Sequence, residues 1–218
     1  YESNEVFVVP RGIHYQNTEH EVSDQYRYLF VGRIEPLKGL HLIINAVHMI
    51  VENAPSFCFS IDIYGDEDVA YADECRKSII NFGLEDRFHF KGKQSNIMDI
   101  YKAYDVLIMP TLAEEAFGRV VIEAMASGVL VLATNAYGPA EIISHRQDGW
   151  LFNTADSSDL SLKILEISNL DTNIFSVMRE KAKQKIQHQY EISIVQGKIL
   201  SILEYIVQRS LNIRSEGL

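Results

Sequence analysis

The chain has 218 residues, enough for one to one and a half ordinary domains, and 47% of them are hydrophobic. Its 20 Lys and Arg against 30 Asp and Glu give a formal net charge of −10. These values exclude a disordered chain and argue against nucleic acid as a partner, because phosphate contacts need a surplus of basic residues.

Two cysteines are too few for a disulfide framework, and their neighbours are apolar. We expect Cys58 and Cys75 to be buried, reduced thiols, which is typical of a cytoplasmic environment. No stretch reaches about 18 uninterrupted apolar residues, so the sequence predicts no transmembrane helix. The chain begins at Tyr1 rather than Met, and we expect it to be a piece of a longer protein.

Strand and helix patterns alternate along the chain. Short apolar runs predict strands at 6–9, 28–32, 57–64, 87–90, 105–109, 129–133 and 150–152. Helical spacing and turn residues predict helices after Lys38, at 69–82, 96–104 and 118–127, near Pro139, and at 156–168, 172–189 and 191–208. The alternation predicts a single doubly wound α/β domain, Rossmann-like, with a mainly parallel sheet and a helical C-terminal end. Ligands of such folds bind at the carboxyl ends of the strands.

The loop after the strand at 28–32 carries two cations, Arg33 and Lys38, around a proline turn at the start of a helix. Arginine can hold a phosphate through two hydrogen bonds, and lysine supplies a compact charge. Helix N-termini also attract anions. The pair therefore suits a diphosphate, although two solvated cations beside a turn would give the same spacing.

The loop after the strand at 105–109 carries Glu115 and Gly118, and Glu123 follows on the next helix. A carboxylate in a strand-end loop can accept hydrogen bonds from sugar hydroxyls, and one on the helix could hold the vicinal hydroxyls of a ribose. Glycine lets the backbone approach a ligand closely. The spacing of the glutamates carries little weight by itself, since acidic residues are 30 of 218. A solvated Glu115 and a helix-surface Glu123 are the alternative.

Taken together, these segments resemble the retaining glycosyltransferases of family 4, the glycogen-synthase-like group. The matching chain, from Val6 to about Ile206, is similar to the C-terminal, donor-binding lobe of their two-lobed GT-B fold. The segments that carry the resemblance are Val8–Ile13, Gly32–Gly39, Gly65-Asp66, Phe90–Gly92, Glu115–Gly128 and Ala136–Trp150. Arg11 stands where the family usually has asparagine, and Glu67 lies in a turn where the family often has a second glycine.

The resemblance implies a role for each matching residue. Arg33 and Lys38 would bind the donor diphosphate and stabilise the charge of the leaving group. Glu115 would hold hydroxyls of the donor sugar, and Glu123 would contact the ribose. The further donor-binding positions are Gly32, Lys91, Gly92, Ala116, Phe117, Gly118, Arg119 and Val120.

The backbone of 116–118 would line the sugar and phosphates, Lys91 and Gly92 would edge the base, and Val120 would pack behind the ribose. An Arg–Lys pair can replace the magnesium ion of other nucleotide enzymes. We find no Asp-x-Asp in a suitable loop and no histidine cluster, so we predict no metal and no cofactor.

The resemblance implies an enzyme that transfers a hexosyl or other glycosyl group from a nucleotide-diphosphate sugar with retention of configuration, as in bacterial polysaccharide biosynthesis. By the same resemblance, residues 1–218 are the donor-binding lobe. An N-terminal lobe outside the chain would hold a saccharide or lipid-linked acceptor and could bring peripheral membrane association. The lobe alone should be inactive.

Two alternatives remain, a non-catalytic nucleotide-sugar binding module and a nucleotide-sugar epimerase of the same fold. An NAD-dependent dehydrogenase is excluded, because no Gly-x-Gly-x-x-Gly opens the first strand–helix unit.

Overall fold

The computed structural model describes residues 7–14 and 26–216, with side chains described up to residue 210. The strands are β1 (Tyr28–Val31), β2 (Ile61–Tyr64), β3 (Phe88–Gly92), β4 (Val106–Met109), β5 (Leu130–Thr134) and β6 (Trp150–Phe152). The helices are α1 (Leu40–Asn53), α2 (Val69–Asn81), α3 (Ile97–Tyr101), α4 (Arg119–Ala126), α5 (Tyr137–Ile142), α6 (Ser157–Ser168), α7 (Thr172–Gln189) and α8 (Ile192–Glu216). Two 3-10 turns, η1 (Pro36–Lys38) and η2 (Glu85–Arg87), complete the elements.

The six strands form one sheet in the order β3-β2-β1-β4-β5-β6, and every neighbouring pair is parallel. From β1 the chain adds strands toward β3 and then returns to place β4 on the other side of β1. The sheet therefore reverses its winding between β1 and β4, which is where doubly wound folds bind ligands. This arrangement confirms the predicted fold class.

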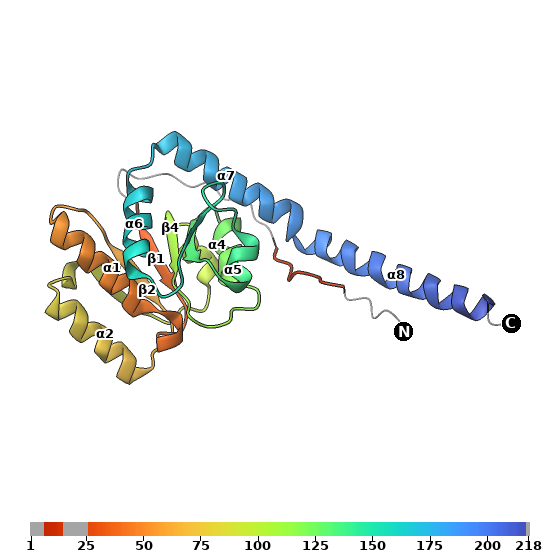
Figure 1. Cartoon of the computed structure of the whole chain (residues 1–218), viewed down its shortest axis with the longest axis horizontal. Helices are drawn as coiled ribbons and strands as arrows, with labels where there is room; N and C mark the ends of the chain where they lie inside the picture. The colour runs from red at the N-terminus through yellow and green to blue at the C-terminus, as the bar shows by residue number, and fades with distance from the viewer. Residues whose placement is uncertain (1–6, 15–25, 217–218) are drawn as a thin grey trace.

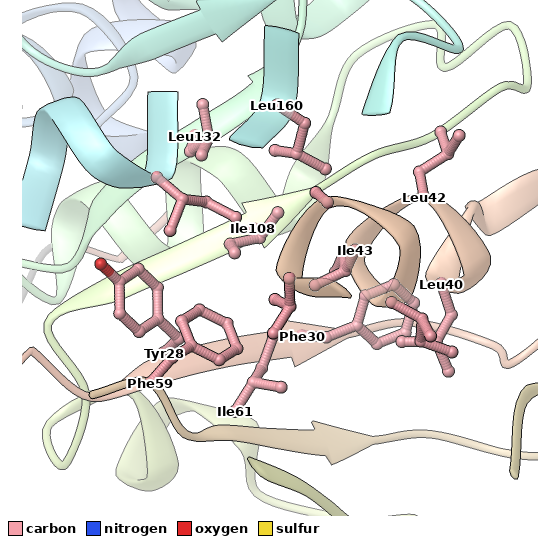
Figure 2. Packing of buried hydrophobic residues seen from close by; sticks show 14 of the residues in the cluster. Tyr28, Phe30, Leu40, Leu42, Ile43, Phe59, Ile61, Ile108, Leu132 and Leu160 are labelled. Carbon is pink, nitrogen blue, oxygen red and sulfur yellow. The ribbon is translucent and has the colours of Figure 1, made fainter. Parts of the chain in front are cut away.

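The side chains of β1 alternate between two hydrophobic clusters, as the two-residue period of a strand requires. Tyr28 and Phe30 point to the side of the sheet that α1, α2 and α6 cover (Figure 1). Figure 2 shows this cluster, in which Phe59 and Ile61 approach the two β1 rings and Ile43 of α1 lies above them. Burial of these large apolar side chains contributes about 1.5–3 kcal/mol each.

The opposite side of the sheet is covered by α3, α4, α5 and the end of α7. Leu29 of β1 is buried there with Leu107 of β4 and Val121 of α4. Helix α7 serves both layers, because Phe175 belongs to the first cluster and Ile186 to the second. The central strands are thus buried on both faces, which explains their nearly continuous apolar sequences.

Three predictions about elements and burial were wrong. Residues 7–9 form no strand, and the run predicted as a strand at 57–64 is regular only from Ile61. Cys58 is exposed, whereas Cys75 is buried as predicted.

Helix α8 projects from the body of the molecule, and the segment 7–14 runs beside its start (Figure 1). Within the described part of the chain, its predicted apolar face is partly uncovered, since Val195 is buried and Ile202 half-buried while Ile199 and Leu203 are exposed. Among the described residues, no helix combines the length and hydropathy needed to cross a bilayer.

Candidate functional site

The loop after β1 is built around two close backbone contacts. Gly39, which precedes α1, has φ +73°, and a Cβ there would lie 2.1 Å from the Pro110 carbonyl oxygen. A Cβ on Gly65 would lie 1.8 Å from the carbonyl oxygen of Gly32. Only glycine permits either approach. The loops that follow β1, β2 and β4 are consequently pressed together at one edge of the sheet.

The loop after β4 is held from two sides. The Leu112 N–H donates to the Leu37 carbonyl at 2.8 Å, which ties the loop to η1. The Gly138 N–H donates to the Glu115 carbonyl at 2.9 Å, and a Cβ on Gly138 would lie 2.6 Å from the Phe117 carbonyl carbon. Gly118 then turns the chain into α4 with φ +70°. Residue 115 is therefore fixed through its backbone, with its side chain free to face the loop after β1.

These constraints bring Lys38 and Glu115 together. The Lys38 Nζ lies 2.9 Å from Glu115 Oε2, and each side chain is 27% exposed. The two residues are 77 positions apart in the chain. A cation suited to phosphate and a carboxylate suited to sugar hydroxyls thus stand side by side at the reversal point of the sheet.

Arg33 stands at the same edge but is more open to solvent. Its guanidinium lies 2.7 Å from the Glu35 carboxylate, and its side chain is 70% exposed. An exposed ion pair of this kind is worth about 0–1 kcal/mol, so an anionic ligand could displace Glu35 at little cost.

Glu123 lies one turn inside α4, and its side chain is only 8% exposed. The predicted helix-surface alternative is therefore wrong. Arg119, on the first turn of α4, donates from Nε to Glu123 Oε1 at 2.6 Å while its own side chain stays 73% exposed. A buried carboxylate with one exposed partner can exchange that partner for the hydroxyls of a ligand.

The structure places Lys91 differently from the other predicted residues. In the pairing of β2 with β3, Phe90 faces Ile63 and Gly92 faces Tyr64, so Lys91 is the extra residue of a β-bulge. Its ammonium lies 3.3 Å from the Asp62 carboxylate.

The residues after the bulge approach the site instead. Lys93 lies 2.7 Å from Asp66, and Lys93 and Gln94 line the same pocket as Gly65. Sequence reasoning missed both residues. Their position just beyond a strand end was the available signal, whereas the bulge at Lys91 has no signal in the sequence.

Two adjoining pockets contain most of the predicted residues. One, of about 150 Å³, is lined among others by Gly32, Lys38, Glu115, Arg119 and Val120. The next, of about 340 Å³, shares Gly32, Arg119 and Val120 and adds Arg33 and Glu123. We call the two together the β1–β4 groove. The predicted residues Lys91, Gly92 and Ala116–Gly118 are not among those lining it.

A larger pocket, of about 730 Å³, lies elsewhere, around the residues before β1 and β2. It lacks the paired cation and carboxylate of the β1–β4 groove, and we do not consider it the binding site.

The acidic turn after β2 is occupied with protein contacts. Asp66 pairs with Lys93, Glu67 receives two hydrogen bonds from Arg76, and Asp68 caps α2 by accepting from the Tyr71 N–H. Within residues 7–14 and 26–216, no three His, Cys, Asp or Glu side chains are grouped to hold a metal ion.

Comparison with known proteins identifies the family of the chain. The profile described as "Glycosyl transferases group 1" matches residues 15–188. Among curated relatives, the "Putative colanic acid biosynthesis glycosyltransferase WcaL" of Escherichia coli (strain K12) is 26% identical over 181 residues, covering 80% of this chain and 44% of that protein. The "N-acetyl-alpha-D-glucosaminyl L-malate synthase" of Bacillus anthracis is 27% identical over 150 residues, covering 67% of this chain and 34% of that protein. The chain spans less than half the length of these relatives.

Solved structures agree with the fold. A glycosyltransferase from Rickettsia africae ESF-5 matches with a TM-score of 0.77 and 25% identity, over 85% of this chain and 49% of that one. Anabaena Alr3699/HepE, solved in complex with UDP, matches with a TM-score of 0.75 and 26% identity, over 84% of this chain and 49% of that one. With the parallel sheet and the family match in agreement, the chain belongs to the group 1 glycosyltransferases and has the fold of a GT-B lobe.

Proposed function

We propose that this chain binds a nucleoside-diphosphate sugar in the β1–β4 groove and contributes the donor side of a retaining glycosyl transfer. The observation that carries the proposal is the pairing of Lys38 with Glu115 at 2.9 Å, where the sheet reverses its winding. The relative HepE has been crystallised with UDP and with UDP-glucose, which supports a donor of this class.

In this proposal each groove residue contacts a different part of the donor. Arg33 and Lys38 take the diphosphate, Glu115 accepts hydrogen bonds from the sugar hydroxyls, and Glu123 accepts them from the ribose. In the structure Lys38 and Glu115 form an ion pair with each other. Binding of the donor would replace this one contact with two contacts to the ligand. The phosphates take the ammonium and the sugar takes the carboxylate.

In the transfer, the bond between the anomeric carbon and the diphosphate oxygen breaks, and the electron pair leaves with the diphosphate. An acceptor hydroxyl forms the new bond to the anomeric carbon, and its proton passes to the departing diphosphate oxygen. Arg33, Lys38 and the N–H groups at the start of α4 stabilise the charge that builds on the phosphate, an electrostatic effect that often dominates catalysis. We also propose that the transfer needs no metal ion, because the two cations supply the charge that magnesium would bring.

The acceptor belongs, in this proposal, to a part of the protein outside these 218 residues, because the relatives are more than twice as long as the matched region. A cytoplasmic location is part of the same proposal. The chain alone should bind the donor and transfer nothing to a saccharide acceptor.

Calorimetry with UDP, GDP and ADP in the presence of a chelator tests the proposal. At least one of them should bind, and Arg33→Ala and Lys38→Ala should each weaken that binding by about 1–3 kcal/mol, the range for charged hydrogen bonds. Lys102→Ala is the matched control, since that ammonium lies 3.5 Å from Asp99 and outside the groove. Absence of binding heat with all three nucleotides, or equal losses in the control, would contradict the proposal.

A further inference from the structure

A buried tyrosine hydroxyl lies behind the groove. Tyr101 ends α3, is fully buried, and packs in the same cluster as Val121 and Ile122 of α4. Its hydroxyl forms no hydrogen bond with any protein group of the described residues. A buried polar group without a partner is costly, and a phenylalanine would supply the same packing without that cost. The hydroxyl therefore needs an explanation.

Glu123 is the group that the Tyr101 hydroxyl faces. Burial raises the pKa of Tyr101 well above its ordinary value, and the neighbouring Glu123 carboxylate raises it further. Helices α3 and α4 pack together, so the two side chains meet inside their contact. The hydroxyl and the carboxylate are thus close enough to interact, although no hydrogen bond of good geometry joins them.

Arg119 holds the Glu123 carboxylate from another side. Its guanidinium draws Glu123 Oε1 to 2.6 Å from the exposed side of α4. A carboxylate has about four acceptor positions, enough to serve a protein donor on one side and ligand hydroxyls on the other. A ligand that takes the place of the exposed Arg119 would leave the carboxylate between the Tyr101 hydroxyl on one side and the ligand hydroxyls on the other.

We propose that Tyr101 is a positioning residue whose hydroxyl donates to Glu123 when a nucleotide is bound, and so aims the carboxylate at the vicinal hydroxyls of the ribose. This inference depends on the proposed function, because it takes Glu123 as the ribose contact. Tyr101 touches no ligand itself. It acts by fixing one side of a carboxylate whose other side faces the groove.

The test compares two ligands across Tyr101→Phe. Calorimetry measures the affinity for UDP and for 2′,3′-dideoxy-UDP, or for the corresponding pair of whichever nucleotide binds most tightly. The parent chain should prefer the ribose form. Tyr101→Phe should weaken binding of the ribose form about tenfold and leave the dideoxy form unchanged, because only the ribose uses the aimed carboxylate. In a Glu123→Gln background, Tyr101→Phe should have much less effect, as expected of coupled residues.

Tyr28→Phe is the matched control. It also removes a buried tyrosine hydroxyl, here one that lies 2.8 Å from the Ser168 hydroxyl, on the side of the sheet opposite α4. It should leave the preference for ribose intact. Urea unfolding of both variants shows whether each remains folded under the conditions of the titration.

Each outcome decides one point. If the parent chain and Glu123→Gln fail to distinguish ribose from dideoxyribose, the ribose role of Glu123 is wrong and this inference falls with it. If the parent chain distinguishes them and Tyr101→Phe changes both affinities equally, or neither, Tyr101 is structural or bonded to a buried water and only this inference is overturned.

Discussion

Lys38 and Glu115 neutralise each other at the point where the donor is expected to bind. The sequence alone predicted both residues and their separate roles. It could not predict their contact, because 77 residues separate them and only the pairing of β1 with β4 brings them together. The consequence is that a change in one of them alters the availability of the other.

Glu115→Gln should therefore weaken the binding of one ligand and not of the other. Binding of the nucleotide-diphosphate sugar should weaken by about 1.5–3 kcal/mol, because the sugar hydroxyls lose a charged acceptor. Binding of the nucleoside diphosphate alone should be unchanged or tighter by up to about 1 kcal/mol, because Lys38 is freed for the phosphates. Titration of both ligands checks this, with the exposed neighbour Glu114→Gln as control. Equal weakening of the two ligands would show that Glu115 contacts something other than the sugar.

The wrong prediction for Cys58 has a local cause. Cys58 was expected to be buried because its neighbours are apolar. Phe57 and Phe59 do point inward, and the alternation of an extended segment then turns Cys58 outward. That Lys91 edges the base stays a prediction. The structure adds that Lys91 lies at a bulge of β3, which nothing in the local residue pattern predicts.

At the scale of elements, the alternation of strands and helices was predictable because it depends on local hydrophobic periods. The docking between loops was not, because it depends on single backbone contacts between distant glycines and carbonyls. Gly39 against Pro110 is the clearest example. This contact carries Lys38 to its position, so stability and binding should respond together when it is lost.

Gly39→Ala should lower the free energy of unfolding by more than Gly83→Ala does. Both glycines have positive φ, +73° and +64°, so both substitutions introduce backbone strain of about 1–2 kcal/mol. A Cβ at residue 83 meets nothing within 4 Å, whereas one at residue 39 would lie 2.1 Å from the Pro110 oxygen. Urea denaturation measures the difference, and calorimetry should show weaker nucleotide binding for Gly39→Ala alone. Equal losses of stability in the two variants would mean that the loops after β1 and β4 can move apart at no cost in free energy.

At the scale of the whole molecule, the fold class followed from the sequence because a doubly wound sheet is the common solution for alternating elements. The exposed face of α8 did not follow. Its helical spacing resembles that of a buried helix, and only the structure shows that Leu203 has no covering layer within the described residues. The apolar pattern establishes that a face is suited to burial, not what buries it.

Cys75 provides a probe of the entire fold. It is buried on α2, and burial raises the pKa of its thiol to about 11, so the native thiol should not react with alkylating or disulfide reagents near neutral pH. In a Cys58→Ser chain, labelling should require unfolding, and nucleotide at a hundred times its Kd should slow the labelling about a hundredfold. The exposed Cys58 in a Cys75→Ser chain should react at once, with or without nucleotide. If the nucleotide does not change the rate of Cys75 labelling, α2 opens locally without global unfolding.

The reversal of the sheet between β1 and β4 also determines when the site can form during synthesis of the chain. A chain synthesised from its N-terminus finishes β1, β2 and β3, with both cations proposed to bind the phosphates, before Val106 and the rest of β4 exist. The carboxylate proposed to bind the sugar arrives later, on the other half of the sheet. Under the proposed function, the nucleotide sugar would have no complete site until the two halves have joined, and it would protect the finished fold without helping the earlier half to form.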